Sequence, residues 1–171
     1  MTFSITMLIA SEIIRGAKGG EFMDFQTTLK ALGVVVMLVL SSGLLFLFAV
    51  SFIHSDTVFS LVSTILGTLI GFVTGAYMPM GIMPRIVQDV CNLIPVSQGA
   101  SLLRHLYMDG LINRLFEGAP ASVLSDYRLI QGIDLTVRNT VLTDPIMTMY
   151  LAGSILVFLI LSILRFNAMK N

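Results

Sequence analysis

Few side chains in this sequence could do acid–base, nucleophilic or metal chemistry, and those few are far apart. His54 lies in a short polar stretch with Asp56, and His105 directly follows Arg104. A long uncharged stretch between the two histidines should place them at opposite ends of a helix, so they predict no shared metal site. Each histidine is interpreted as a solvated or interfacial residue. The single cysteine, Cys91, allows neither an intrachain disulfide nor a cysteine metal cluster.

Sequence motifs of soluble enzymes are also missing. The chain contains no glycine-rich phosphate loop, no HExxH zinc motif and no serine nucleophile elbow. We therefore expect neither a cofactor nor a metal site, and an enzyme using His54 or His105 is the least favoured alternative. The formal net charge of zero gives no reason to expect nucleic-acid binding.

The composition indicates what surrounds the chain. Of its 171 residues, 56% are hydrophobic and 12% are charged, whereas soluble domains carry about 25% charged residues. Since about 20 apolar residues form a helix that crosses a hydrocarbon layer of about 30 Å, each long uncharged stretch can be a membrane span. Inside lipid the backbone must satisfy its own hydrogen bonds, which favours helices. The sequence thus predicts an all-α membrane protein, a helical bundle with three transmembrane helices, at 34–53, 58–77 and 146–164.

The ends of these predicted spans constrain their arrangement. The four residues 54–57 leave room only for a tight turn, so the first two spans should run antiparallel. Asp144 can cap the third span, and Pro145 suits its first turn. None of the span cores carries a charge, which argues against a proton relay or an ion pathway lined by charges. Residues 1–33 are interpreted as a truncated or interfacial segment, because the apolar run 3–10 is too short to cross.

Small residues recur at every fourth position along the second predicted span. The series is Ser63, Gly67, Gly71 and Gly75. On a helix these residues form one stripe, which another helix can approach closely. Packing within the same chain is the favoured interpretation, and a subunit interface is the alternative.

Prolines divide the segment that follows the second span. Helix-breaking residues first interrupt the chain, and residues 85–93 then have the pattern of a short amphipathic helix. A second short helix is predicted over 97–108, with Ser97 as its cap and Gly110 as its stop. Together they predict a helical hairpin, either re-entrant or lying at the lipid headgroups. Residues 111–144 are interpreted as a polar loop to which no chemistry can be assigned.

The order of these features from Ala49 to Gly110 resembles the membrane subunit of type-2 ATP-binding-cassette (ABC) exporters. Each motif is short, and the order and spacing of the motifs make the resemblance. The motifs are Ser51-Phe52-Ile53-His54-Ser55-Asp56, Gly75-Ala76-Tyr77-Met78-Pro79, Gly81-Ile82-Met83-Pro84, Asn92-Leu93-Ile94-Pro95 and Gly99-Ala100-Ser101-Leu102-Leu103-Arg104.

The resemblance implies an architecture. The three spans would be the fourth to sixth of six, so that residues 34–171 form the C-terminal half of an exporter transmembrane domain. Residues 78–145 would be an external hairpin and loop, and His54 and Asp56 would lie in a cytoplasmic turn. The residues implied to shape the hairpin are Pro79, Gly81, Pro84, Pro95 and Arg104.

The resemblance also implies a function. The chain would be a permease component in the cell membrane, surrounded by lipid and paired with a second permease half, identical or different. A cytosolic ABC ATPase subunit would drive transport, so the chain itself is not expected to be an enzyme. The alternative is a non-transporting membrane scaffold or accessory subunit.

The distribution of basic residues opposes the implied orientation. The side taken as cytoplasmic carries two basic residues, Arg165 and Lys170, and the other side carries eight. The positive-inside rule applies to loops of up to about 60 residues, and the predicted external loop is longer. The orientation of the family is therefore kept as the expectation.

Overall fold

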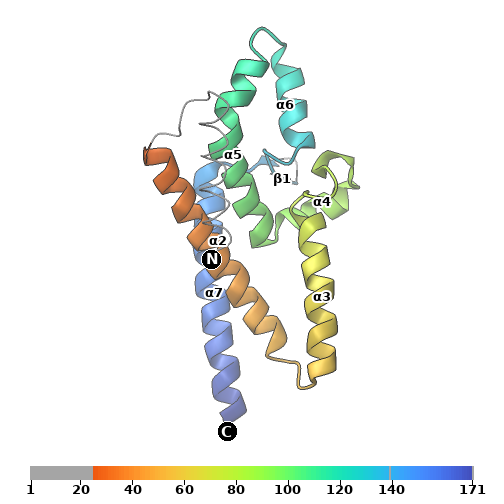
Figure 1. Ribbon diagram of the computed structural model, residues 1–171, viewed down its shortest axis with the longest axis vertical. Coiled ribbons are helices and arrows are strands. Elements are labelled where there is room, and N and C mark those ends of the chain that lie inside the picture. The colour runs from red at the N-terminus through yellow and green to blue at the C-terminus, as the bar shows by residue number, and fades with distance from the viewer. Residues whose placement is uncertain (1–24, 139, 171) are drawn as a thin grey trace, which may run out of the picture.

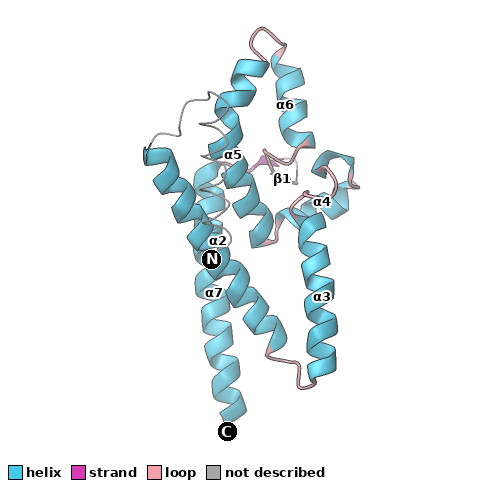
Figure 2. Cartoon of the chain, in the orientation of Figure 1, coloured by secondary structure: helices cyan, strands magenta, loops and turns pink. Residues whose placement is uncertain are grey.

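The computed structural model describes residues 25–138 and 140–170, and this part of the chain is mostly helical (Figures 1 and 2). The interpretation of residues 1–24 lies outside the described residues. The long helices are α2 (Phe25–Val50), α3 (Asp56–Val73), α5 (Pro95–Leu115) and α7 (Asp144–Lys170). The short elements are η1 (Met80–Ile82), α4 (Arg85–Asn92), α6 (Ala121–Ile130), β1 (Thr136–Val137) and β2 (Thr140–Val141). The two strands pair antiparallel.

Three of these helices are long and apolar enough to cross a membrane, and they coincide with the three predicted spans. The crossing segments are Gln26–Val50, Asp56–Val73 and Asp144–Ala168. The second helix ends at Val73 rather than at the predicted residue 77. Its end has a local cause, since Gly75 adopts a φ of +70° and the N–H groups of Gly75 and Ala76 donate to the carbonyls of Phe72 and Gly71. This pair of hydrogen bonds is a Schellman motif, which ends a helix at a glycine.

Helices α2, α5 and α7 lie against one another and enclose the principal core (Figure 1). Leu102, Leu135, Met147 and Leu151 form this core, and each is at most 4% exposed. Helix α5 comes close to α2 at Gly99, where an added Cβ would lie 2.4 Å from Leu38 Cδ1. The core therefore joins two span-capable helices to one helix, α5, that is outside the predicted spans.

Helix α3 lies to one side of this assembly and contains no buried residue (Figure 1). It reverses the chain direction after α2, as the short turn at 54–57 predicts, but the two helices diverge (Figure 1). On α3 the large apolar side chains point outward, for example Leu61, which is 61% exposed. Soluble proteins rarely expose apolar surface of this extent.

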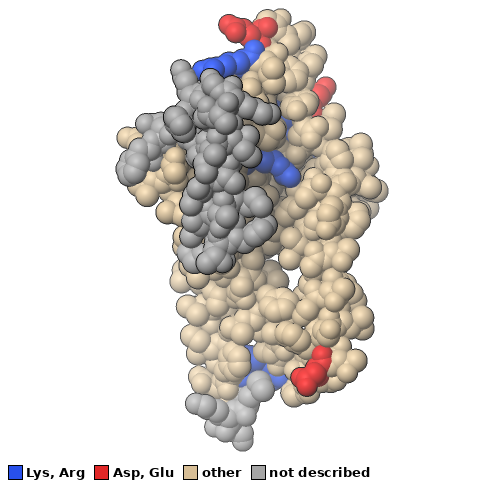
Figure 3. Space-filling model, viewed as in Figure 1, with Lys and Arg blue, Asp and Glu red and all other residues tan. Residues whose placement is uncertain are grey.

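Charged side chains are also unevenly distributed along the length of the molecule. In Figure 3 they appear over the upper part and at the lower end of the molecule, and the visible tan band between these two regions is uncharged. Together with the exposed apolar surface of α3 and α7, this band matches a protein surrounded by hydrocarbon over the middle of its length.

The segment after α3 contains more regular structure than the sequence predicted. Helix α5 passes through Gly110 and ends at Leu115. A glycine inside a helix costs only about 1 kcal/mol relative to alanine, so it need not end one. Gly118, with a φ of +84°, lies in the turn that follows. The predicted loop 111–144 contains α6 and the β1–β2 pair.

Candidate functional site

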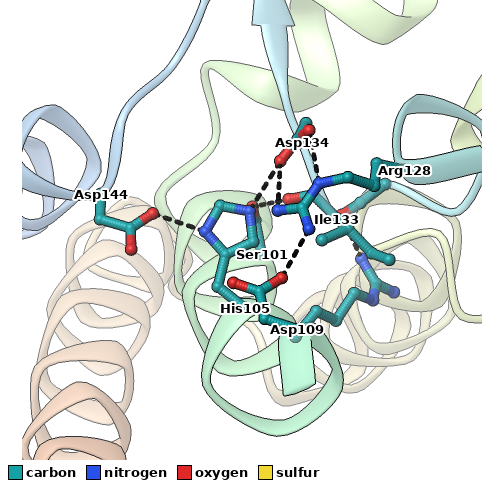
Figure 4. Close-up of polar contacts among 9 residues, drawn as sticks. Ser101, His105, Asp109, Arg128, Ile133, Asp134 and Asp144 are labelled. Carbon is teal, nitrogen blue, oxygen red and sulfur yellow. Dashed lines mark hydrogen bonds and ion pairs between the residues drawn. The ribbon is translucent and has the colours of Figure 1, made fainter. Parts of the chain in front are cut away.

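A cluster of charged side chains connects α5, α6 and the first turn of α7 (Figure 4). His105 lies at its centre and is 8% exposed. The His105 Nδ1 atom lies 2.5 Å from Asp144 Oδ1, and its Nε2 atom lies 2.9 Å from Asp134 Oδ1. Both ring nitrogens therefore face a carboxylate, one on each side of the imidazole.

Arg128 holds the other side of Asp134. Its Nε atom donates to Asp134 Oδ2 at 2.8 Å, and Nη2 donates to Oδ1 at 3.0 Å. A third N–H of Arg128 donates to Asp109 Oδ1 at 2.7 Å, which returns the network to α5. Burial raises the pKa of Asp134, but the hydrogen bonds and charge of Arg128, with a further contribution from His105, outweigh it and lower this pKa below its ordinary value.

A second polar junction fixes the end of α3. Arg104 donates from Nη2 to the Thr74 carbonyl at 2.7 Å and from Nη1 to the Gly132 carbonyl at 3.0 Å. Ser97 donates to the Val73 carbonyl at 2.6 Å. Carbonyls at a helix end lack partners within the helix, so these donors satisfy groups that would otherwise be left unbonded. Burial lowers the pKa of the Arg104 guanidinium.

Ser97 does not cap α5, contrary to the prediction from sequence. The helix begins two residues earlier, at Pro95, with Ile94 in the capping position. Proline suits the first helical position because its missing N–H would have no partner there. The hydroxyl of Ser97 is then free to reach α3.

His105 is buried, which contradicts the solvated alternative of its prediction, and the interfacial alternative stays a prediction. Its partners, Asp134 and Asp144, are 29 and 39 residues away, so no local spacing could identify them. Asp144 lies at the start of α7 as predicted. The available signal is the concentration of charged residues in the segment between Arg104 and Asp144, most of which the sequence predicts as a polar loop.

The predicted turn between the first two spans has the expected place in the chain. His54 is exposed in the turn, and Asp56 is the first residue of α3. The structure does not bring His54 and His105 together, since the turn lies at the opposite end of α3 from the junction made by Arg104.

The predicted stripe on α3 has different surroundings at each position. An added Cβ at Gly67 would meet nothing within 4 Å, so among the described residues no helix packs there. At Gly71 an added Cβ would lie 2.2 Å from the Tyr77 ring, which folds back over this position. Ser63 has a buried hydroxyl for which the described residues offer no partner. Gly75 ends the helix rather than continuing the stripe.

The predicted hairpin residues lie at element boundaries. Pro79 precedes η1, Pro84 precedes α4, and Pro95 begins α5. Gly81 permits close contact, because an added Cβ there would lie 2.6 Å from the Cα atom of Ile130. These residues set where each element begins and how closely η1 approaches α6.

The chemistry open to this arrangement is proton binding and helix attachment. Among residues 25–138 and 140–170, no group of three His, Cys, Asp or Glu side chains could hold a metal ion. Cys91 is buried, and burial raises the pKa of its thiol. Comparison of the chain with protein-family models, curated proteins and solved structures gives no match.

Proposed function

We propose that this chain is the membrane-spanning permease component of an ATP-driven ABC exporter and forms part of a translocation pathway. The observation that carries the proposal is the helix pair α4–α5, which follows a proline-divided turn at the end of α3. Arg104 and Ser97 attach this pair to the last turn of α3. The same order of elements, a span followed by two helices and a final span, underlies the resemblance to type-2 ABC exporters.

The orientation of α4 supports a membrane-facing position for this pair. Ile86 is 79% exposed and Val90 is 57% exposed, whereas Asn92 on the other face is 2% exposed. The Asn92 side chain donates to the Thr136 carbonyl at 2.8 Å. A helix with its apolar face outward and its polar face toward protein suits a hydrocarbon environment, where backbone outside a full span must pack against protein. This favours the re-entrant form of the hairpin.

The exposed side of α3 supports a partner subunit. Helix α3 contains no buried residue, and Gly67 has open space in front of it. In membranes, small residues favour helix association because they let two backbones approach closely. A second permease half would occupy this side.

The energy for transport would come from the partner ATPase, acting at the end of the molecule that carries the turn 51–55 and the C-terminal part of α7. Movement of these helices would open a pathway alternately to each side, or transiently as a channel. The uncharged span surfaces suit a hydrophobic or amphiphilic cargo.

Co-purification tests the proposal directly. The tagged chain is extracted in mild detergent, and stoichiometric subunits are identified by mass spectrometry. We expect an ABC ATPase and a second permease half. A folded, monodisperse chain that recovers neither subunit, even when any upstream sequence of its gene is included, would favour the scaffold alternative.

A matched pair of α3 variants sharpens this test. Gly67→Leu adds a side chain where the isolated chain has free space, so it should leave the chain folded and reduce recovery of the partner half at least tenfold. Leu61→Ala, on the same helix, is the control and should leave recovery unchanged. Normal recovery of the partner half with Gly67→Leu would exclude α3 as the surface that binds it.

A further inference from the structure

We propose that His105 is the proton-holding centre of a clasp that fastens the first turn of α7 to α5, and that loss of this proton opens the clasp at α7. The clasp is defined by His105, Asp134, Asp144, Arg128 and Asp109. It connects a span-capable helix to two helices outside the spans (Figure 4).

The two hydrogen bonds of the His105 ring require a proton at this centre. An ionised carboxylate only accepts hydrogen bonds, and a neutral imidazole has a single N–H. Both nitrogens of His105 lie within 2.9 Å of a carboxylate oxygen. The imidazolium form donates to both oxygens, whereas the neutral form sets a nitrogen lone pair against one carboxylate.

The net charge of the cluster also favours protonated His105. Three carboxylates, on Asp109, Asp134 and Asp144, share the fixed positive charge of Arg128. Protonated His105 leaves a net charge of −1, and neutral His105 leaves −2. The proton therefore reduces repulsion between the carboxylates of α5, α7 and the segment after α6.

The α7 side of the clasp is the side that opens. Asp134 keeps two hydrogen bonds from Arg128 and is 20% exposed, so a neutral His105 retains its single N–H bond there. Asp144 is 58% exposed and has water available in place of the imidazole. Loss of the proton thus breaks the contact between His105 and Asp144 first.

Other charged groups lie on the elements that pack around His105. On α5 they are Arg104 and Asp109, and the guanidinium of Arg104 is directed to the carbonyls of Thr74 and Gly132. On α2, which packs against α5, the charged residue is Lys30, and it is exposed. Imidazole is the side chain whose ordinary change of charge falls near neutral pH. The chain has two histidines, so the His54→Gln variant is needed to assign a pH response to His105.

The clasp has a consequence that rests on the proposed function. If the chain is an exporter permease, the clasp lies outside the membrane and lets external acidity fasten the outer end of the last span. The clasp itself does not depend on a partner ATPase, so its test and the co-purification test can fail separately.

The test measures the distance between α5 and α7 in the full chain, reconstituted in lipid nanodiscs. Spin labels are placed at Leu111→Cys and Met149→Cys, both exposed positions, in a Cys91→Ala background. Between pH 5 and pH 8 we expect a second, longer-distance population to appear at the higher pH. An unchanged distance distribution over this range overturns the proposal.

Three variants test whether His105 causes the change of distance with pH. His105→Gln should give one distribution at both pH values, whereas His54→Gln, which replaces the exposed histidine, should respond as the unsubstituted chain does. Asp144→Asn should stay closed at pH 8, because its amide can donate to a neutral imidazole. A response in His105→Gln equal to that of the unsubstituted chain overturns the proposal.

A spectroscopic readout keeps the test decisive if His105→Gln fails to fold. The His54→Gln chain contains a single histidine, so its ring nitrogens can be followed by ¹⁵N NMR during titration. We expect the ring to lose its proton over the pH range in which the longer-distance population appears. Deprotonation in a different range, with the distance change unaffected, would separate the two events and overturn the clasp.

Discussion

Helices α7 and α3 can both cross a membrane, yet they are held in different ways. Helix α7 has Met147 and Leu151 fully buried, and the hydroxyls of Ser154 and Ser41 on α2 lie 2.6 Å apart. Helix α3 has no buried residue and is attached mainly through the carbonyls of its last turn. Apolar composition therefore predicts a membrane span for both helices but does not tell which helix packs within its own chain.

The difference separates a fixed unit from a surface available to a partner. The unit of α2, α5 and α7 contains the core and the clasp. Helix α3 has the length of a span but contributes nothing to this core. In a membrane, close packing and hydrogen bonds associate helices, because lipid tails are as apolar as the side chains. Helix α3 has few such contacts within the described residues, which is the physical basis for expecting a partner there.

The largest expected effect on the free energy of unfolding comes from truncating one leucine on α7 and comparing it with one on α3. Leu151→Ala removes a side chain that is 0% exposed and should lower the free energy of unfolding by about 3 kcal/mol. Leu61→Ala removes one that is 61% exposed and should change it by less than about 0.5 kcal/mol. Denaturation of the isolated chain in mixed detergent micelles measures both. Equal losses for the two variants would mean that α3 is packed as firmly as α7.

An intermediate effect is expected from acid. The pKa of Asp134 is lower in the folded chain than its ordinary value of about 3.9. Its contribution to stability is therefore complete above pH ~4 and is lost as the pH falls through the lower folded value. Its hydrogen bonds with Arg128 join charged groups, for which about 2 kcal/mol is typical.

Asp134→Asn should therefore lower stability at pH 7 and flatten the loss of stability between pH 4 and pH 2. The matched control is Asp126→Asn, at an exposed carboxylate on α6, which should leave the acid profile unchanged. Unfolding free energies measured from pH 7 to pH 2 provide the comparison. An acid profile in Asp134→Asn as steep as that of the unsubstituted chain would assign the acid response to other groups.

The sequence predicts the regions that depend on local composition. Three uncharged stretches predict the helices that are long and apolar enough to span, because charge is excluded from hydrocarbon whatever the fold. The prolines at 79, 84 and 95 mark real boundaries, since their missing N–H and fixed φ act within a few residues. Boundaries set by glycine were harder, because Gly75 ends a helix and Gly110 does not.

The clasp could not be predicted from sequence, because its partners meet only after the chain folds. Arg128 and Asp134 are six residues apart, but His105 meets Asp144 across 39 residues. Their contact depends on α5 packing against α7 through Leu102, Met147 and Leu151. Charge in a segment between predicted spans favours a solvated loop, whereas here it forms a network around one buried side chain, His105.

The smallest expected effect tests the glycine stripe on α3. Gly67→Ala places a methyl group in open space and should stabilise the isolated chain by up to about 1 kcal/mol, because alanine is the better helix former. Gly71→Ala should lose this gain, because its methyl group would overlap the Tyr77 ring. Unfolding of each variant in detergent, with and without Tyr77→Ala, measures the difference. If Tyr77 blocks this position, Tyr77→Ala should restore the gain at Gly71 and leave Gly67→Ala unaffected. Failure to restore it would show that something other than the Tyr77 ring requires a glycine at this position.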